Sequence, residues 1–410
     1  MAPTITARLD ALAQLTSQAD GLTRTYLSKE HKAAAQLILG WMRDAGMSAK
    51  IDAAGTVVGR TEGTRADAKT LLVGSHIDTV RNAGRFDGNL GVVLAIEAVA
   101  ELRRASTALP CAIEVLAFGD EEGVRFPRTL SGSRAVAGTF DPDALDAVDA
   151  DRISLRQALV EFGCDPAAIG RAARDPGSVL GYIEVHTEQG PVLETEDQPV
   201  GVVTAISGAS RYQVTVGGMA GHAGTLPMPM RRDALTAAAE MVLAIETIGR
   251  GEAGLVATVG QIAARPGAVN VVPGEVIFSI DVRSPIDGTR RSGVRQIERD
   301  LRAIARRRQC GVQLAETYNE KAVTCDQRFI RHFSAAIERA GGNATGLPSG
   351  AGHDGLAMAQ LCPIGMLFVR CKGGVTHHLS ESVKPEDIEV ATRVLIDFLG
   401  HLSPSGRTIA

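Results

Sequence analysis

Residues 74–80 read GSHIDTV, and residues 84–91 read GRFDGNLG. The apolar run LLV at 71–73 comes just before them and is typical of a buried parallel strand. Open α/β sheets carry functional side chains at the carboxyl ends of such strands, so this stretch predicts a functional edge. His76 and Asp78 are two residues apart and therefore point to the same side of an extended chain.

Length and composition indicate a globular protein of two domains. The 410 residues exceed one ordinary core, 45% of them are hydrophobic, and 45 glycines suggest many tight connections. A formal net charge of −4 gives no electrostatic footprint for nucleic acid or for an anionic membrane. We therefore expect a small-molecule substrate, with no nucleic-acid or membrane partner.

The cysteines and the N-terminus favour a cytoplasmic location. The six cysteines are scattered without a Cys-x-x-Cys pair, as is typical of reduced thiols. Residues 1–10 lack the basic and apolar regions of a signal peptide. The sequence contains no run of about 18 apolar residues, so we expect no membrane span.

The first half of the chain alternates helix and strand patterns, which predicts a doubly wound α/β domain. Helices are expected at 4–19, 30–46 and 91–102, a strand and turn at 50–60 with Gly55 inside, strands at 113–118 and 182–186, and short helices and loops at 140–176.

A different pattern begins near residue 205. Strands at 212–216, 255–262 and 275–283 and helices at 232–248 and 292–308 follow the βαββαβ order of a ferredoxin-like domain. The α/β pattern resumes with a helix at 329–340, a strand at 363–369 and a helix at 386–402. We expect a catalytic domain at 1–209 and 322–410, with a small α+β domain inserted at 210–321.

Ligand-type side chains follow several separate strands: His76, Asp87, the pair Glu121-Glu122, His186, and the loop GGVTHH at 373–378. This set predicts a site for two divalent ions about 3.5–4 Å apart with a shared carboxylate. Nitrogen and oxygen donors suit Zn²⁺, Mn²⁺ or Co²⁺ rather than thiolate-seeking metals. Of two adjacent glutamates, one can bind metal while the other acts as general base.

Seven motifs carry a resemblance to a known family: GSHIDTVRNAGRFDG, FGDEEGVRF, YIEVHTEQGPVLE, GMAGHAGTLPM, PGAVNVVP, SGAGHD and GGVTHH. Together they resemble the amidase, hydantoinase and carbamoylase branch of the M20 metallopeptidases, in order, from about Leu22 to the last helix. This branch includes allantoate amidohydrolases, N-carbamoyl-L-amino acid hydrolases and β-ureidopropionases. The resemblance implies a two-metal exopeptidase-like catalytic domain with an inserted lid domain that also forms a homodimer.

The resemblance also implies a role for each matching residue. It puts one metal ion on His76 and His186 and the other on Glu122 and His377, with Asp87 as the bridge. Mn²⁺ or Zn²⁺ is expected, with Co²⁺ and Ni²⁺ as further options.

Two residues of the same motifs match roles in the proton chemistry. Glu121 falls on the catalytic base, and Asp78 falls on the carboxylate behind the metal ligands. His377 is preferred over His378 as a ligand because it follows the small hydroxyl residue Thr376, but His378 stays an alternative.

Substrate contacts are implied on both predicted domains. Arginine suits a carboxylate because its planar fork donates two parallel hydrogen bonds. His222 is expected to stabilise the oxyanion and to reach the partner subunit's site. Without the family, His222 would be a turn residue and Arg283 a surface ion pair. The expected contacts are Gln189, Arg211, His222, Asn270, Arg283, Gly352 and His353.

The sequence therefore predicts a hydrolase that cleaves the ureido C–N bond of a small carboxylate and releases ammonia and CO₂. Allantoate is the first choice because GLTRTYLS and FVRCKGG look most like that subgroup. The alternatives are an N-carbamoyl-L-amino acid hydrolase or β-ureidopropionase, an M20 aminoacylase or dipeptidase, and a ligand-binding relative without catalysis. His186 counts against an aminoacylase, which usually carries a carboxylate there, and Glu121 counts against lost catalysis.

Overall fold

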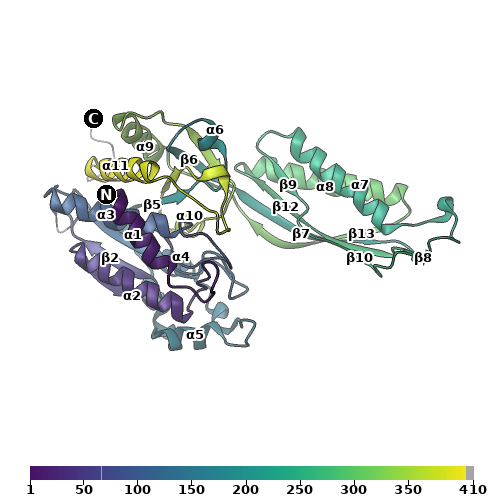
Figure 1. The fold of residues 1–410 in the computed structure, drawn as a ribbon, viewed down its shortest axis with the longest axis horizontal. Coiled ribbons are helices and arrows are strands. Elements are labelled where there is room, and N and C mark those ends of the chain that lie inside the picture. The colour runs from purple at the N-terminus through teal and green to yellow at the C-terminus, as the bar shows by residue number, and fades with distance from the viewer. Residues whose placement is uncertain (66, 403–410) are drawn as a thin grey trace. The chain divides into compact units, whose positions relative to one another are not determined.

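The computed structural model describes residues 1–65 and 67–402. The chain divides into two compact units, Met1–Thr204 with Thr324–Ala410, and Ala205–Val323. Both are visible in Figure 1. No helix in the described ranges has the length and apolar character that a bilayer crossing requires.

A nine-stranded mixed sheet organises the larger unit. Its strand order is β1-β2-β4-β3-β5-β16-β6-β14, with β15 paired to β6. The strands are β1 (Ser48–Ile51), β2 (Val57–Thr61), β3 (Thr70–His76), β4 (Ala112–Phe118), β5 (Val179–Thr187), β6 (Val200–Ile206), β14 (Val323–Thr324), β15 (Gly346–Ser349) and β16 (Ile364–Val369).

The central strands β3, β4, β5 and β16 pair in parallel, so their carboxyl ends lie at one edge of the sheet. Every residue of these four strands is buried. Near-continuous apolar runs are typical of parallel strands that are covered on both faces.

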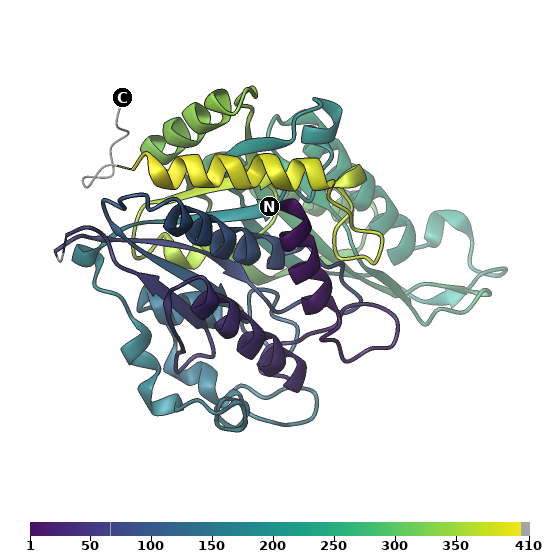
Figure 2. The same cartoon turned by 60° about the vertical axis from the view of Figure 1, so that its left-hand side comes forward.

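Helices cover this sheet. Helix α3 packs on β3 and β5, and α11 packs against α3, α9 and β16. Figure 2 shows α11 in yellow in front of the sheet. The helices are α1 (Ala2–Ala13), α2 (Lys29–Asp44), α3 (Asn89–Arg104), α4 (Ser131–Ala137), α5 (Leu155–Phe162), α6 (Val192–Thr195), α9 (Gln327–Arg339), α10 (Gly355–Met358) and α11 (Pro385–Gly400), with 3₁₀ turns η1 (Pro142–Asp146), η2 (Pro166–Ala172), η3 (Pro176–Ser178) and η5 (Lys372–Gly374).

Local sequence explains where several of these helices begin. The Ser28 hydroxyl accepts a hydrogen bond from the His31 N–H at the start of α2. Helix α11 begins with Pro385 and has Glu386 and Asp387 in its first turn, where acidic groups favour the helix dipole.

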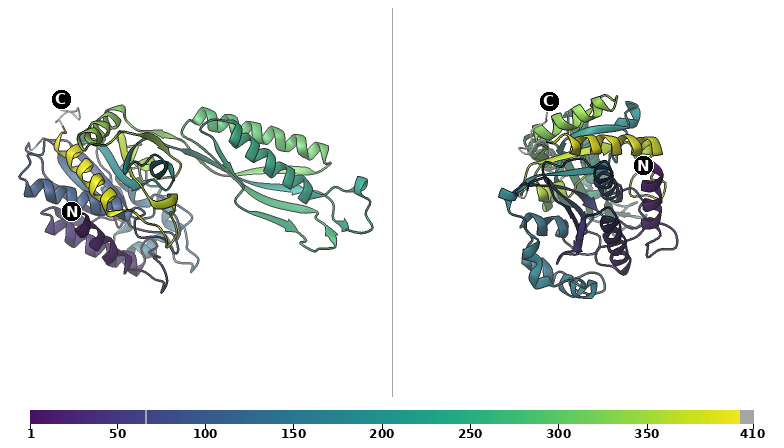
Figure 3. Two further views of the ribbon diagram at one scale, coloured as in Figure 1. Left: turned by 45° about the horizontal axis from the view of Figure 1, so that its top comes forward. Right: turned by 90° about the vertical axis from the view of Figure 1, so that its left-hand side faces the viewer.

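The smaller unit is a five-stranded antiparallel sheet with two helices on one face, as Figure 3 shows. Its strand order is β10-β12-β7-β13, and β9 also pairs with β12. Its elements are β7 (Gly208–Gly217), β8 (Gly221–His222), η4 (Met228–Met230), α7 (Ala234–Gly251), β9 (Val256–Thr258), β10 (Ile262–Arg265), β11 (Val271–Val272), β12 (Glu275–Ser284), α8 (Asp287–Arg307) and β13 (Gly311–Glu320).

Alternate burial along β12 creates the core of this unit. Val276, Phe278, Ile280 and Val282 are buried in one cluster with residues of α7 and α8, while the residues between them are only half-buried. Between α7 and α8 the chain forms β9, β10, β11 and β12, which is more than the two strands of the βαββαβ order that the sequence predicts.

Three element predictions need correction. The segment at 50–60, expected as a strand and turn, contains parts of two antiparallel strands, β1 and β2, with Gly55 in the turn between them. The helix expected at 4–19 ends at Ala13, because the Thr16 hydroxyl bonds the Gly21 carbonyl and the Thr23 N–H and turns the chain. The strand expected at 255–262 is two strands, β9 and β10, separated at Gly260, a residue type that often interrupts strands.

Candidate functional site

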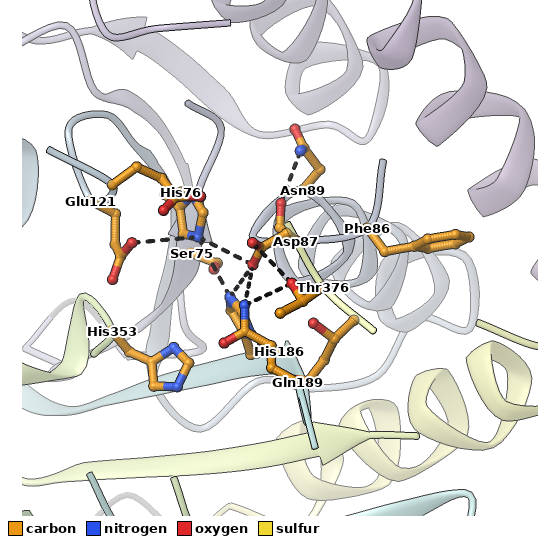
Figure 4. A network of polar contacts seen from close by, with 12 residues as sticks. Ser75, His76, Phe86, Asp87, Asn89, Glu121, His186, Gln189, His353 and Thr376 are labelled. Carbon is orange, nitrogen blue, oxygen red and sulfur yellow. Dashed lines mark hydrogen bonds and ion pairs between the residues drawn. The ribbon is translucent and has the colours of Figure 1, made fainter. Parts of the chain in front are cut away.

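Five segments of the larger unit bring ligand-type side chains together at the carboxyl edge of the central strands (Figure 4). Strands β3 and β5 carry His76 and His186 near their ends. The other three segments are loops, which hold Asp87 before α3, Glu121 and Glu122 after β4, and His377 after η5.

Gly88 allows the Asp87 loop to approach β3. Its φ angle is 64°, in the left-handed region that glycine adopts readily. A Cβ atom at this position would also lie 2.5 Å from the His76 imidazole. Any other residue at 88 would therefore separate Asp87 from His76.

Asp87 lies at the centre of the cluster. Its Oδ1 atom is 3.1 Å from Nε2 of His186 and 3.9 Å from Nε2 of His76. Its Oδ2 atom is 3.1 Å from Nε2 of His377. The carboxylate thus has histidines on both oxygens, the arrangement of a bridging ligand.

The two strand histidines turn their Nε2 atoms toward each other. Nδ1 of His76 is 3.0 Å from the Asp78 carbonyl, and Nδ1 of His186 is 3.0 Å from the Thr187 carbonyl. A carbonyl only accepts, so Nδ1 carries a proton in each ring, and in the neutral ring Nε2 keeps the lone pair that can bind a cation. The two Nε2 atoms are 3.4 Å apart. Two acceptors and a carboxylate at this spacing fit a bound cation.

Three overlapping groups of donor atoms each lie within 4.8 Å of one another and can hold a metal ion. They are His76, Asp87 and His186; His76, Glu121 and Glu122; and Asp87, Glu122 and His377. The donors are nitrogen and oxygen only, which suits Zn²⁺ and Mn²⁺.

Asp78 fixes the turn that carries the two glutamates. Its carboxylate accepts hydrogen bonds from the backbone N–H groups of Glu121, at 3.2 Å, and Glu122, at 3.4 Å. Oε2 of Glu121 then lies 3.9 Å from Nε2 of His76, and Oε2 of Glu122 lies 3.7 Å from Nε2 of His377. The adjacent glutamates therefore face different histidines.

Burial and neighbouring charges set the proton affinities of the site. Burial, followed by the charge of Glu122, raises the pKa of Glu121 well above its usual value. Burial alone would raise the pKa of Asp87, but hydrogen bonds from His186 and His377 hold that pKa well below its usual value. Glu121 therefore has the greater proton affinity of the two.

The GAGHD loop lies beside the cluster. The His353 ring is buried and packs edge-on against His186, with centroids 4.5 Å apart, and its Nε2 is 2.7 Å from the Ser349 hydroxyl. A Cβ atom on Gly352 would lie 4.0 Å from Oε1 of Glu121. The substrate-binding roles of both residues stay predictions.

Gln189 also reaches the centre. Its side-chain amide donates to Oδ1 of Asp87 at 2.9 Å and to the Thr376 hydroxyl at 3.1 Å (Figure 4). Its predicted contact with a ureido group stays a prediction.

The two neighbouring histidines of the last loop differ in their contacts. His377 belongs to a donor group with Asp87 and Glu122. His378 is exposed, and its Nδ1 lies 2.8 Å from the Ser380 hydroxyl. The choice of His377 as ligand stays a prediction that this geometry favours.

The predicted residues of the smaller unit occupy two places within it. Arg211 and Arg283 both bond the Asp281 carboxylate, at 2.9 Å and 2.8 Å, and line a hollow of about 610 Å³. His222 lies on β8, which pairs with β11, and the Asn270 carbonyl accepts the Ala223 N–H at 2.9 Å. Their substrate roles stay predictions.

Sequence reasoning missed two buried carboxylates. Glu184 accepts hydrogen bonds from the Ser75 hydroxyl and the Gly355 N–H, both at 3.1 Å. Glu381 bonds the loop that carries Asp87. A charged residue two positions before His186 in an otherwise apolar strand was the available signal for Glu184.

Comparison with known proteins identifies the family of the chain. The model of peptidase family M20/M25/M40 matches residues 72–401, and the chain belongs to this family. It is 41% identical to an N-carbamoyl-L-amino acid amidohydrolase of Geobacillus stearothermophilus, over 95% of both chains. It is 39% identical to an allantoate deiminase of Arabidopsis thaliana, over 96% of this chain and 81% of the relative.

A solved structure shows the same fold. A hydantoinase/carbamoylase family amidase from Burkholderia multivorans superimposes with a TM-score of 0.92 at 32% identity, covering 100% of this chain and 99% of the other. The protein is a hydrolase of carbon–nitrogen bonds, as the sequence predicts. Its family is metal-dependent, and the donor groups around Asp87 suit such ions.

Proposed function

We propose that the protein hydrolyses the ureido C–N bond of a small carboxylate and that allantoate is its substrate. The observation that carries the reaction type is a largely enclosed glutamate, Glu121, whose side chain is 12% exposed, beside donor groups centred on Asp87. The named relatives, which include an allantoate deiminase, support the substrate class.

Two divalent ions complete this proposed centre, with Mn²⁺ or Zn²⁺ as the first candidates. His76 and His186 would hold one, Glu122 and His377 would hold the other, and Asp87 would contribute its carboxylate to both. Bound there, the ions would supply a Lewis acid for the scissile carbonyl and would lower the pKa of the attacking water.

Glu121 moves the proton in this mechanism. Its carboxylate accepts a proton from the attacking water, and the buried surroundings that raise its pKa favour keeping that proton. Glu121 then donates the proton to the leaving nitrogen, and ammonia is released. Asp78 holds the backbone N–H of Glu121 and so fixes the base.

The inserted unit is proposed as a lid that binds the substrate carboxylate and forms the homodimer. Arg211 and Arg283 are the candidate carboxylate binders, since a guanidinium donates two parallel hydrogen bonds. Asn270 adds an uncharged donor, and His222 stabilises the oxyanion of the partner's site. The Asp281 contact keeps both arginines ordered on the same sheet face.

N-carbamoyl-L-amino acids are the second candidate substrates. They are favoured by the 41% identity to the Geobacillus stearothermophilus relative over 95% of its length. Allantoate and N-carbamoyl amino acids both present a ureido group near a carboxylate, so the same centre serves either.

The test is turnover of a substrate panel with added Mn²⁺. The panel contains allantoate, N-carbamoyl-L-amino acids, N-carbamoyl-β-alanine and N-acetyl amino acids, with ammonia and free amine as readouts. The highest kcat/KM is expected for allantoate. A higher value for an N-carbamoyl amino acid would select the second candidate. Hydrolysis of N-acetyl amino acids alone would overturn the ureido assignment.

A further inference from the structure

Glu381 is a buried carboxylate that the proposed chemistry does not use. Its residue is 6% exposed, and it follows His377 by four positions. Its own N–H donates to the His378 carbonyl at 3.0 Å, which closes a turn. The side chain therefore belongs to the loop that carries His377 but lies away from solvent.

One carboxylate oxygen of Glu381 holds the Asp87 loop. Oε2 accepts hydrogen bonds from the backbone N–H of Phe86 at 2.8 Å and of Asp87 at 3.3 Å. Gly84 leaves room for this contact, because a Cβ atom there would overlap the Glu381 carboxylate. Glu381 thus bonds a segment nearly 300 positions away in the sequence.

The other carboxylate oxygen of Glu381 accepts a hydrogen bond within the loop that carries His377. Oε1 accepts the Thr376 hydroxyl at 3.1 Å, and the same hydroxyl lies 3.4 Å from Oδ2 of Asp87 (Figure 4 shows Thr376 and Asp87). Thr376 directly precedes His377, whose Nε2 lies 3.1 Å from that Oδ2 atom. A single carboxylate therefore connects the backbone of Asp87 with the residue beside His377.

The two halves of the cluster depend on this connection to different degrees. His76 and His186 lie on buried strands and are each 1% exposed, so the sheet holds them. The His377 side chain is 48% exposed and lies on a loop, with a φ angle of 55°. Fewer other contacts therefore fix His377 relative to Asp87 than fix the two strand histidines.

From this geometry we propose that Glu381 is a positioning residue that keeps Asp87 and His377 together. Its loss should selectively weaken the ion held by Asp87, Glu122 and His377. The ion held with His76 and His186 should be kept. This inference rests on the proposed two-metal centre. Partners of this kind behind metal ligands are typically worth 10- to 100-fold in metal affinity.

The test measures Mn²⁺ binding to the stripped full-length protein, with free Mn²⁺ followed by electron paramagnetic resonance. In Glu381→Ala the Mn²⁺ affinity of one of the two sites should fall by at least ~10-fold. The affinity of the other site should stay within about twofold of the wild-type value. Glu381→Gln should lose less Mn²⁺ affinity than Glu381→Ala, because the amide oxygen of the glutamine can still accept hydrogen bonds from the backbone N–H groups. The matched control is Glu389→Gln, an exposed glutamate on α11. It should bind two ions as the wild type does.

A double variant separates positioning from general destabilisation. If Glu381 acts through His377, adding Glu381→Ala to His377→Ala should weaken binding no further, because coupled residues are not additive. If Glu381→Ala does not fold, Glu381→Gln and Thr376→Val replace it, and each is compared alone and in combination with His377→Ala.

The contradicting outcomes are distinct. Two unaltered sites in the Glu381 variants, or equal weakening of both sites, would overturn this inference alone. A wild-type protein that binds no Mn²⁺ would overturn the two-metal centre and this inference with it.

Discussion

The Nε2 atoms of His76 and His186 lie 3.4 Å apart, and the Nδ1 atom of each ring lies 3.0 Å from a backbone carbonyl oxygen. When both rings are neutral, their two Nε2 lone pairs face each other at this distance and repel unless a proton or cation lies near both. Asp87 adds a carboxylate oxygen 3.1 Å from Nε2 of His186. This arrangement predicts that the site's affinity for a cation is built into the two parallel strands.

Metal removal should abolish activity and spare most of the fold. The purified protein should bind up to two divalent ions per chain, because the donor atoms form overlapping groups around Asp87. The measurement combines metal analysis, circular dichroism and ammonia release before and after chelation, with Mn²⁺ added back as the control. Stripped protein that stays fully active in metal-free buffer would contradict the mechanism.

The two neighbouring histidines of the last loop should behave differently. His377→Ala removes a nitrogen 3.1 Å from Asp87 and should weaken one ion site by at least ~10-fold. His378→Ala removes a side chain that contacts Ser380 and should leave metal binding nearly unchanged. The measurement is a Mn²⁺ titration of both variants. The reverse result would assign the ligand to His378.

Acid should destabilise the protein through a histidine outside the site. Burial, followed by the charges of Arg24 and Arg125, lowers the pKa of His31 to about 3. The unfolded chain, with a pKa near 6.5, binds the extra proton first, so His31 contributes full stability above about pH 6.5. That contribution falls as the pH drops toward 3, by up to about 1.4 kcal/mol per pH unit.

His31→Gln cannot titrate and is the matched comparison. The stability difference between wild type and variant should narrow between pH 7 and pH 4.5, as measured from urea midpoints in the presence of a chelator. Site histidines are common to both proteins, so their titration cancels. A difference that stays constant over this range would show that His31 is not the group responsible.

Much of the fold could be predicted because its signals are local. Apolar runs such as 71–73 and 115–118 lie in β3 and β4, and residues at period-2 spacing share a side of the strand. The end of α1 could not be predicted so well, because Thr16 stops the helix through hydrogen bonds to Gly21 and Thr23.

The parts of the site that depend on contacts between distant segments of the chain were harder to predict from the sequence. His76 and His186 follow apolar strands, so their meeting at one sheet edge could be expected. Glu381 carries no such signal, because its partners Phe86 and Asp87 are far away in the sequence. Only the folded structure shows that they meet.

Complementation should reveal whether two subunits share a site. His222→Ala and Glu121→Gln chains are each expected to be inactive alone. If His222 acts on the partner subunit's site, a mixed dimer contains one site with both residues intact, and activity should return on subunit exchange. Differently tagged chains provide the control that exchange has occurred. Exchange without recovered activity would place His222 in its own chain's site or outside catalysis.

Glu121→Gln tests the central claim most directly, because the substitution keeps the size of the side chain but removes its ability to accept a proton. We predict that kcat falls by at least ~10²-fold, the scale of general-base loss, while bound metal stays at the wild-type level. The measurement is steady-state ammonia release from allantoate or an N-carbamoyl amino acid, with metal analysis of the same preparation. A variant that changes only KM would make Glu121 a substrate contact and would contradict its assignment as the base.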